Sequence, residues 1–460
     1  MLTFRDLTLA DRRTVESYTL RADTRNCDLA FANMFCWRDV YRPQLAVADG
    51  FLLIKFRVGG SGRVGYMQPL GEGDFSSVVP LLAADARSHG QRLRIIGLTA
   101  EGCAAVRRCG EFAFVSRRAE EDYIYRAADL RTLAGRRYQP KRNHINRFVQ
   151  SYDYRYAALE PSMFDECMRL EGVWRSEHTS SGDDALTAEQ QAMQEAFAHF
   201  GELGLRGGCI YVGDRMVAFT YGSAIDRRTF CIHIEKADTC YEGAFTMINR
   251  LFAESLPESF EWINREEDLG LPGLRRSKLS YHPAQLLHKY TALHLHADEL
   301  ACKRLWSECF DDDESFVDAF IADVYSRRRM LSVTDPTGRL VSMLHVIPMQ
   351  SRLGRTAYIY GVATAPDSRG RGHASHLVHE ALARIAAEGY DAAMLIPGSD
   401  GLREFYARSG FADTQLPVVF EGDFDFGTGD SSADRAMVRL LRPAAGIRAG
   451  EGPLVCRCEI

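Results

Sequence analysis

A short segment rich in arginine and glycine has the composition of an anion-binding turn. Its residues are Arg369, Gly370, Arg371, Gly372, His373 and Ala374. A pyrophosphate needs several donors that converge on it, and backbone N–H groups at a helix N-terminus supply them together with a favourable dipole. The two glycines let the main chain approach such a ligand closely, and the two arginines add positive charge. Residues 357–364 form a predicted strand and a helix is predicted to begin near Ala374, which is the context that this chemistry requires.

This segment resembles the cofactor loop of the GNAT acyltransferase superfamily, in which arginine or glutamine is followed by two residues, glycine, one residue, and glycine or alanine. Arg369, Gly372 and Ala374 match that pattern. The resemblance implies that acetyl-CoA binds at the loop. It also implies that backbone groups of the preceding strand, at Val362 and Thr364, pair with the pantetheine arm. A plain tight turn that caps a helix is the alternative for the loop by itself.

A second match to that superfamily lies in residues 402–411, where a tyrosine is followed by three residues and a Gly-Phe pair. Gly410 suits the position just after a helix, and Phe411 starts the next predicted strand. The resemblance implies that Tyr406 protonates the departing thiolate, while a backbone N–H near Val362 stabilises the oxyanion. A packed aromatic on an amphipathic helix is the alternative for Tyr406.

The sequence does not single out the general base that removes a proton from the incoming ammonium. The candidates by neighbourhood are Tyr358, Tyr360, His345 and Glu404. Three histidines recur at steps of three, which fan around a helix and are typical of a solvated edge. These are His373, His376 and His379. The twelve cysteines show no paired CxxC spacing, and the close pair Cys456 and Cys458 ends the chain, so we expect no metal site.

Residues 1 to about 295 contain strings that resemble the phosphatidylglycerol lysyltransferase C-terminal-like domain. A basic stretch runs through 137–148, an unusual string occupies 264–281, and 33–38 is a weaker match. The resemblance implies two GNAT-like modules in tandem, and characterised relatives move an aminoacyl group from a charged tRNA to a lipid headgroup. This sequence has no apolar run of the roughly 20 residues that span a bilayer, which argues against a lipid acceptor.

Two groups of side chains in this region could bind a substrate. Residues 136–147 carry enough positive charge for phosphate in a tRNA, a lipid or a cofactor. Residues 264–278 offer carboxylates for an ammonium and cations for a carboxylate or phosphate. The candidate substrate-binding residues are Lys141, Arg142, Asn143, Asn146, Glu266, Asp268, Arg275 and Lys278. A solvated basic helix and surface ion pairs are the respective alternatives.

The elements that must position these residues recur three times in the order hairpin, strand, loop, helix, strand. The fold class is therefore expected to be α/β (mixed α+β), with three GNAT-fold modules, each a mixed, largely antiparallel sheet flanked by helices. We expect modules at 1–128, 129–295 and 296–443, followed by a tail at 444–460 whose small residues have little to bury. Hydrophobic residues at 46% are ordinary for globular proteins, and a net charge of -6 gives no global case for nucleic-acid or membrane binding. We expect a cytoplasmic protein.

The loops that correspond to the cofactor loop are poor in the first two modules. Residues 71–74 and 237–244 each contain two acids and no arginine, and acids repel a pyrophosphate. The sequence therefore predicts one acetyl-CoA site, in the last module, which acylates an amine of a small molecule or peptide while the first two modules bind or modify another substrate. One alternative is an aminoacyl-tRNA-dependent transferase seated in residues 130–295, and another is a non-catalytic metabolite-binding protein.

Overall fold

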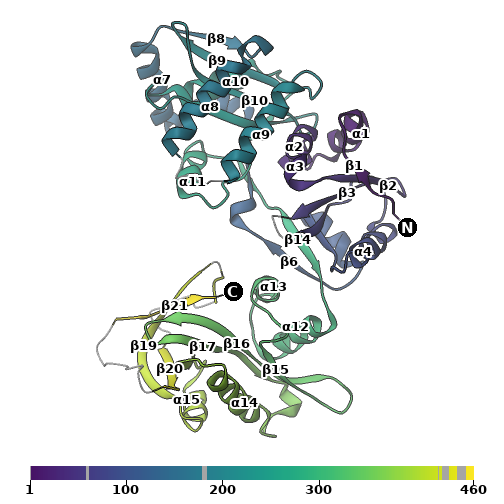
Figure 1. Cartoon of the computed structure of the whole chain (residues 1–460), viewed down its shortest axis with the longest axis vertical. Helices are drawn as coiled ribbons and strands as arrows, with labels where there is room; N and C mark the ends of the chain where they lie inside the picture. Colours follow the sequence, from purple (N-terminus) through teal and green to yellow (C-terminus); the bar gives the residue numbers. More distant parts are fainter. Residues whose placement is uncertain are drawn as a thin grey trace. The chain divides into compact units, whose positions relative to one another are not determined.

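The computed structural model describes residues 2–58, 62–178, 184–422, 424–426, 435–442 and 452–459 (Figure 1). The chain folds into two compact units. One consists of residues 1–110 and 116–293, and the other of residues 111–115 and 294–460. The second unit therefore contains most of β6 (Phe112–Ser116), which precedes the larger part of the first unit in the sequence.

The first unit contains two sheets. The strands of one follow the order β1 (Arg5–Asp6), β2 (Gln44–Ala48), β3 (Phe51–Val58), β4 (Arg63–Met67), β5 (Arg94–Leu98) and β14 (Tyr290–His294). The strands of the other follow the order β13 (Gln285–Leu287), β7 (Asp122–Arg126), β12 (Trp262–Asn264), β11 (Thr229–Ala237), β10 (Arg215–Ala224), β9 (Arg206–Val212) and β8 (Tyr154–Ala158). Strands are exchanged along the chain, because β7 joins the second sheet and β14 returns to the first. Boundaries at 128 and 295 therefore do not divide the strands cleanly between the sheets.

Helices cover both faces of the second sheet because its strands alternate two sets of apolar side chains. Cys209 and Tyr211 lie in one core with Phe197 of α9 (Asp184–Ala198), whereas Ile210 lies in another with Phe252 of α10 (Ala244–Ser255). The other helices of this part are α6 (Ala127–Thr132), α7 (Gln139–Ser151), α8 (Phe164–His178) and α11 (Pro272–Leu279).

The two sheets of the first unit share one apolar core, which also contains residues of α2 (Phe31–Cys36). Leu45 and Leu52 of the first sheet belong to it together with Phe219 of the second. Burial of such side chains stabilises the folded state by about 1.5–3 kcal/mol each. The remaining helices beside the first sheet are α1 (Arg12–Ala22), α3 (Arg38–Tyr41), α4 (Val79–Ser88) and α5 (Ala100–Arg107).

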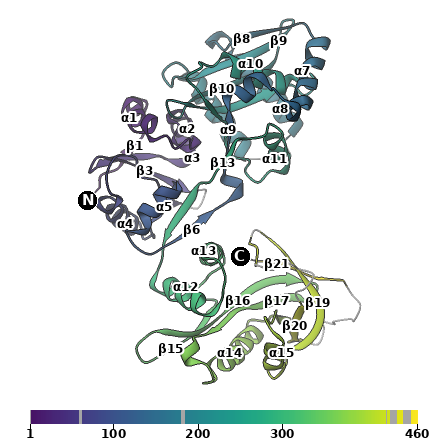
Figure 2. The same ribbon diagram turned by 180° about the vertical axis from the view of Figure 1, so that it is seen from behind.

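The second unit is built on a third sheet. Its strand order is β15 (Met330–Thr334), β16 (Leu340–Ser351), β17 (Gly354–Thr364), β18 (Ala392–Leu395), β20 (Arg435–Leu440), β19 (Ala412–Glu421) and β21 (Leu454–Cys458). Figures 1 and 2 show α12 (Ala297–Cys309) and α13 (Glu314–Asp323) on one side and α14 (His373–Ala387) and α15 (Asp400–Ala407) on the other. The core beneath α14 contains Leu377, Ala381 and Ile385, as its helical spacing predicts.

All three sheets are mixed, with β4–β5, β11–β12 and β17–β18 as parallel pairs among mainly antiparallel neighbours. The predicted fold class, three mixed and largely antiparallel sheets flanked by helices, is confirmed.

The end of the chain differs from the expected tail. Residues 454–458 form β21, which pairs in parallel with β19 at Val418 and antiparallel with β16 at Met349. Leu454 and Cys456 are buried, whereas Val455 and Arg457 between them are exposed. The expectation of a tail with little to bury is therefore wrong for these residues. They form a strand, although a glycine-rich segment precedes them in the sequence.

Candidate functional site

The loop between β17 and α14 brings its glycines to the helix N-terminus. Gly372 precedes the first residue of α14 with φ 80°, and Gly370 has φ 77°. These are left-handed conformations that residues with a Cβ avoid. A Cβ at either glycine would have no atom within 4 Å, so the space over the loop is open. The turn therefore presents its main chain, and the first N–H groups of a 15-residue helix, to a ligand.

The two arginines of the loop are exposed, and each side chain donates to a main-chain carbonyl. Arg369 donates from Nε to the Thr364 carbonyl at 3.2 Å, and Arg371 donates to the Asp367 carbonyl at 3.4 Å. A guanidinium has five N–H donors, so each keeps donors for an anion. The side chain of Asp367 is bound by Arg339 at 2.7 Å. The acid nearest the loop in sequence is thus neutralised.

The strand before the loop separates from its neighbour. β17 pairs with β18 only from Thr356 to Tyr358, yet it continues to Thr364. The Ala365 N–H donates to Val341 of β16 at 2.9 Å, so the Thr364 N–H points to the opposite edge because successive groups alternate along a strand. That edge lies beyond the pairing with β18 and is available to an extended ligand.

A β-bulge interrupts β17 just before this edge. Tyr360 pairs with His345 and Ala363 with Met343, so Gly361 and Val362 together face one residue of β16. Gly361 has φ 58°, and a Cβ there would lie 3.0 Å from the Trp306 ring of α12. The sequence analysis did not name Gly361. An isolated glycine inside a strand is the signal that could have found it.

Tyr406 lies on α15 and is only 6% exposed. Its ring contacts those of Phe405 and Phe411, and it shares a core with Leu377 and Val378 of α14. Burial raises the pKa of the Tyr406 phenol to about 12. Among the described residues its hydroxyl has no hydrogen-bonding partner. The phenol is thus both a packed aromatic and a group that keeps its proton at neutral pH.

The four base candidates lie in different environments. His345 is buried beside Trp306 and Phe320, burial lowers its pKa to about 3, and its Nδ1 has no partner within the described chain. Tyr360 donates to the Phe426 carbonyl at 3.2 Å, and burial raises its pKa. Tyr358 is buried and Glu404 is exposed. The neutral imidazole of His345 can accept a hydrogen bond. Taking up a proton there carries a strong desolvation cost, because the charged ring would be buried.

The histidines of α14 do not converge. His379 Nδ1 contacts its own helix at the Ser375 carbonyl, at 2.7 Å, and His376 lies 3.8 Å from Glu380. His373 begins the helix within the cofactor loop.

The four candidate substrate-binding residues of α7 have different surroundings. Lys141 Nζ lies 3.7 Å from the centre of the Tyr281 ring, and burial, with Arg265 nearby, lowers its pKa to about 8. Arg142 donates to the carbonyls of Leu133 and Gly135. Asn143 accepts from Gln139, and Asn146 is exposed. Lys141 is thus packed against an aromatic ring, whereas Gln139 lies between Arg142 and Asn143.

The acidic and basic residues after β12 mainly satisfy one another. Asp268 is fully buried and accepts from Arg275 at 2.8 and 3.0 Å and from Tyr123 at 2.6 Å. These bonds hold the pKa of Asp268 far below its usual range. Lys278 donates to the carbonyls of Arg265 and Glu267 at 2.6 and 2.5 Å. The network fixes the loop 265–271 against β7.

A buried polar cluster beside this loop was largely missed by the sequence analysis. Lys289 lies 2.9 Å from Asp122 and 3.7 Å from Glu267, whose pKa is raised to about 7, first by burial. Cys27 lies 3.3 Å from Asp122. Glu266, which was predicted, instead contacts His233 at 3.0 Å. Cys27 lies 95 residues from Asp122 and 262 from Lys289 in the sequence, so no local motif could reveal the whole cluster.

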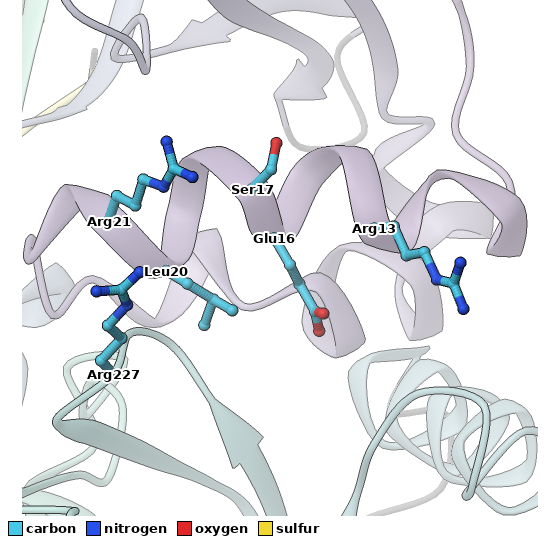
Figure 3. A pocket seen from close by; sticks show the side chains of 6 residues that line it. All are labelled: Arg13, Glu16, Ser17, Leu20, Arg21 and Arg227. Carbon is cyan, nitrogen blue, oxygen red and sulfur yellow. The ribbon is translucent and has the colours of Figure 1, made fainter.

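A shallow hollow of about 280 Å³ lies between α1 and the turn after β10 (Figure 3). It is lined by Arg13, Glu16, Ser17, Leu20, Arg21 and Arg227. Arg21 and Arg227 lie near Leu20, while Arg13 stands at the other end of α1. None of the predicted binding residues lines it.

Residues 21–293 match the family described as phosphatidylglycerol lysyltransferase, C-terminal, and residues 295–413 match the acetyltransferase (GNAT) domain. The chain belongs to the phosphatidylglycerol lysyltransferase C-terminal family. Both resemblances read from the sequence are confirmed. The presence of both domains supports an acyltransferase. No helix in the described ranges has both the length and the apolar character to cross a bilayer.

Several proteins resemble this family member. A conserved protein of unknown function from Bacteroides thetaiotaomicron is 43% identical, with a TM-score of 0.62, and the match covers 64% of this chain and 100% of that one. L-PGS from Bacillus licheniformis is 15% identical, with a TM-score of 0.45, over 62% of this chain and 92% of that one. The GNAT family N-acetyltransferase YhbS of Escherichia coli, solved with CoA, is 18% identical, with a TM-score of 0.28, over 36% and 87%.

An uncharacterised protein of Mycoplasmoides gallisepticum is 24% identical over 170 residues. These residues make up 37% of this chain, and the chain spans only 54% of the length of that relative.

Proposed function

We propose that the second unit transfers an acetyl group from acetyl-CoA to an amine of a small molecule or peptide. The observation that carries this proposal is the junction of β17 and α14. There a left-handed glycine turn exposes the N-terminus of a long helix, directly after a stretch of β17 that does not pair with β18. Phosphates suit the first feature, and an extended arm with amide groups suits the second.

The thioester supplies the activated acyl group, and this chain supplies orientation and protons. Loop 369–374 binds the pyrophosphate, and the free edge at Thr364 pairs with the pantetheine arm. A backbone N–H of the bulge at Val362 stabilises the oxyanion that forms when the amine attacks. Tyr406, whose raised pKa keeps its proton in place, protonates the thiolate as it departs, and the proton that the attacking amine loses returns to Tyr406 through solvent.

The experiment is calorimetric titration of the full chain with acetyl-CoA, with a glutamate placed in the loop. Gly372→Glu adds negative charge and a strained Cβ at the proposed phosphate site, and is expected to abolish binding. Gly338→Glu is the matched control, because Gly338 also has a left-handed φ, of 86°, with no atom within 4 Å of a Cβ. Unchanged affinity in Gly372→Glu, or equal losses in both variants, would refute the site.

Consumption of acetyl-CoA is tested next, with thiol release measured against a panel of amines. Turnover with any amine supports the acetyltransferase. A protein that binds acetyl-CoA and never consumes it is the metabolite-binding protein instead.

An aminoacyl transferase in residues 130–295 is the second candidate, favoured by the family match and by the buried cluster around Glu267 and Lys289. Charged tRNA is the proposed partner, through residues 136–147. Part of the positive charge there is compensated, because Arg147 pairs with Glu242, whereas Arg142 keeps its charge while it donates to main-chain carbonyls. Salt-dependent binding of charged tRNA that is lost in an Arg136→Ala variant would favour this candidate.

A further inference from the structure

Three side chains of the first unit converge on one point between neighbouring strands. Cys231 and His233 belong to β11, and Glu266 follows β12. Glu266 Oε1 lies 3.0 Å from His233 Nδ1 and 3.6 Å from Cys231 Sγ, and the three ligand atoms all lie within 4.8 Å of one another. Cys231 is fully buried, and the side chain of His233 is 7% exposed.

The pairing of the strands produces this convergence. β11 and β12 run in parallel with Cys231 beside Asn264, so Glu266, two residues further on, comes beside His233. On its other side β11 pairs with β10 through a bulge in which His233 is the extra residue, between partners of Tyr221 and Gly222. A bulge of this kind re-aims a side chain.

Two backbone features are specific to this arrangement. A Cβ at Gly222 would lie 1.8 Å from the Cys231 carbonyl, so only glycine permits the bulge. Glu266 itself has φ 55°, a conformation that costs a non-glycine residue about 1–2 kcal/mol. Such strain needs a compensating contact.

Two of the three spacings between these atoms are close to those around a tetrahedral zinc ion. With Zn–S of about 2.3 Å and Zn–N and Zn–O of about 2.0–2.1 Å, ligand atoms are separated by about 3.5 Å for S and O and about 3.3 Å for N and O. The observed separations are 3.6 and 3.0 Å. Thiolate, imidazole and carboxylate together are a donor set that zinc accepts.

The neighbours of the three residues act as a second layer. Ser223 Oγ lies 2.8 Å from His233 Nε2, which orients the ring with Nδ1 toward the other two ligands. Asn33 Nδ2 donates to Glu266 at 2.9 Å. Partners of this kind fix the tautomer and position of metal ligands.

A second group of potential ligands in the same unit already contains a cationic side chain. Cys27, Asp122 and Glu267 also lie close together, but Lys289 Nζ sits 2.9 Å from Asp122 and 3.8 Å from Cys27 Sγ. The ammonium supplies the positive charge there. Within the described ranges no lysine or arginine forms an ion pair with Glu266, and Lys278 donates instead to main-chain carbonyls.

We propose that Cys231, His233 and Glu266 bind one Zn²⁺ with three protein ligands, leaving the fourth position for water or a substrate group. The ion ties the loop after β12 to β11. It is bound independently of acetyl-CoA, which the second unit takes. The absence of paired cysteine spacings predicted no metal site, and no such spacing could reveal this one, because two ligands share a strand while the third follows 33 residues later.

The test uses the full chain, freed of any affinity tag, dialysed against chelator and then reloaded with Zn²⁺ or Co²⁺. Elemental analysis is expected to give one zinc per chain. The Co²⁺ form is expected to show a thiolate-to-cobalt charge-transfer band and the strong visible bands of a four-coordinate site. Zinc far below one per chain, or a cobalt spectrum without the thiolate band, overturns the proposal even if no variant folds.

Variants locate the ion. Cys231→Ser and His233→Ala are expected to lose the metal, and Ser223→Ala to weaken zinc affinity about 10- to 100-fold through the second layer. Cys27→Ser is the matched control, a buried cysteine of the same apolar cluster, and is expected to keep one zinc. Retention of zinc in Cys231→Ser with its loss in Cys27→Ser overturns the proposal in favour of the other group.

Discussion

The Trp306 ring of α12 lies directly over Gly361 of β17, so closely that a Cβ at position 361 would stand 3.0 Å from it. The helix thereby packs against the bulge that precedes the end of the strand at Thr364. The bulge favours glycine at position 361, because the left-handed φ of 58° and the contact with the indole both disfavour a side chain there.

Gly361→Ala is expected to lower the free energy of unfolding by about 2–4 kcal/mol. The left-handed backbone costs about 1–2 kcal/mol and the contact with Trp306 a further share typical of overpacking. Urea denaturation measures the change. Gly338→Ala has the same backbone strain in open space, so its loss is expected to stay near about 1–2 kcal/mol. Equal losses in the two variants would show that the indole contact contributes nothing.

Tyr406→Phe is expected to reduce the rate of acyl transfer by about 100-fold or more while leaving acetyl-CoA affinity unchanged, because only the acid is removed. Single-turnover kinetics and calorimetry separate the two quantities. Tyr390→Phe is the control, since Tyr390 is buried in the same core. The pKa of about 12 means that wild-type activity is not expected to fall through ionisation of Tyr406 until the pH approaches that value. Wild-type turnover in Tyr406→Phe rejects its role as the acid.

Local sequence patterns were sufficient for most of the sheet architecture. The turn residues from Asp335 to Gly338, between two apolar runs, indicate the hairpin of β15 and β16, and the apolar run from Ala392 indicates β18. Such signals are local, since they depend on turn chemistry and periodicity within a few residues. The exchange of β7 and β14 between sheets depends on long-range pairing and left no local trace.

The functional residues also divide into those that a local motif reveals and those that depend on long-range contacts. The glycine turn at Gly370 and Gly372 is a contiguous motif, so the sequence located it. The environment of Asp268 was not accessible, because Tyr123, 145 residues away, donates a hydrogen bond to this carboxylate and Arg118, 150 residues away, forms an ion pair with it. His233 carried no signal either, since a bulge and a following loop bring it to Glu266.

Asp268→Asn is expected to destabilise the protein by about 3 kcal/mol, because Arg275 and Arg118 lose the charge that compensates them. The pKa of Asp268 is depressed in the folded state, so its contribution is present above the unfolded value near about 3.9 and is lost as the pH falls through the folded value. Unfolding free energies measured from about pH 7 to pH 3 should therefore fall less steeply in the variant. Arg275→Met leaves Tyr123 and Arg118 in place and is expected to cost less. A neutral effect of Asp268→Asn contradicts the network.

Lys141 is expected to react as a neutral amine at a lower pH than an ordinary lysine. Burial and the charge of Arg265 lower its pKa from 10.5 to about 8, with its Nζ against the Tyr281 ring. Because the folded pKa lies below the unfolded one, stability from this group rises as the pH increases from about 8 toward 10.5 and is lost as the pH falls through about 8. Lys141→Met should flatten that rise in the free energy of unfolding. Pulse acetylation followed by peptide mass spectrometry should give wild-type Lys141 a labelling midpoint at a pH of about 8. A midpoint near about 10.4, as in model peptides, would place the ammonium in solvent and restore it as a cation for tRNA.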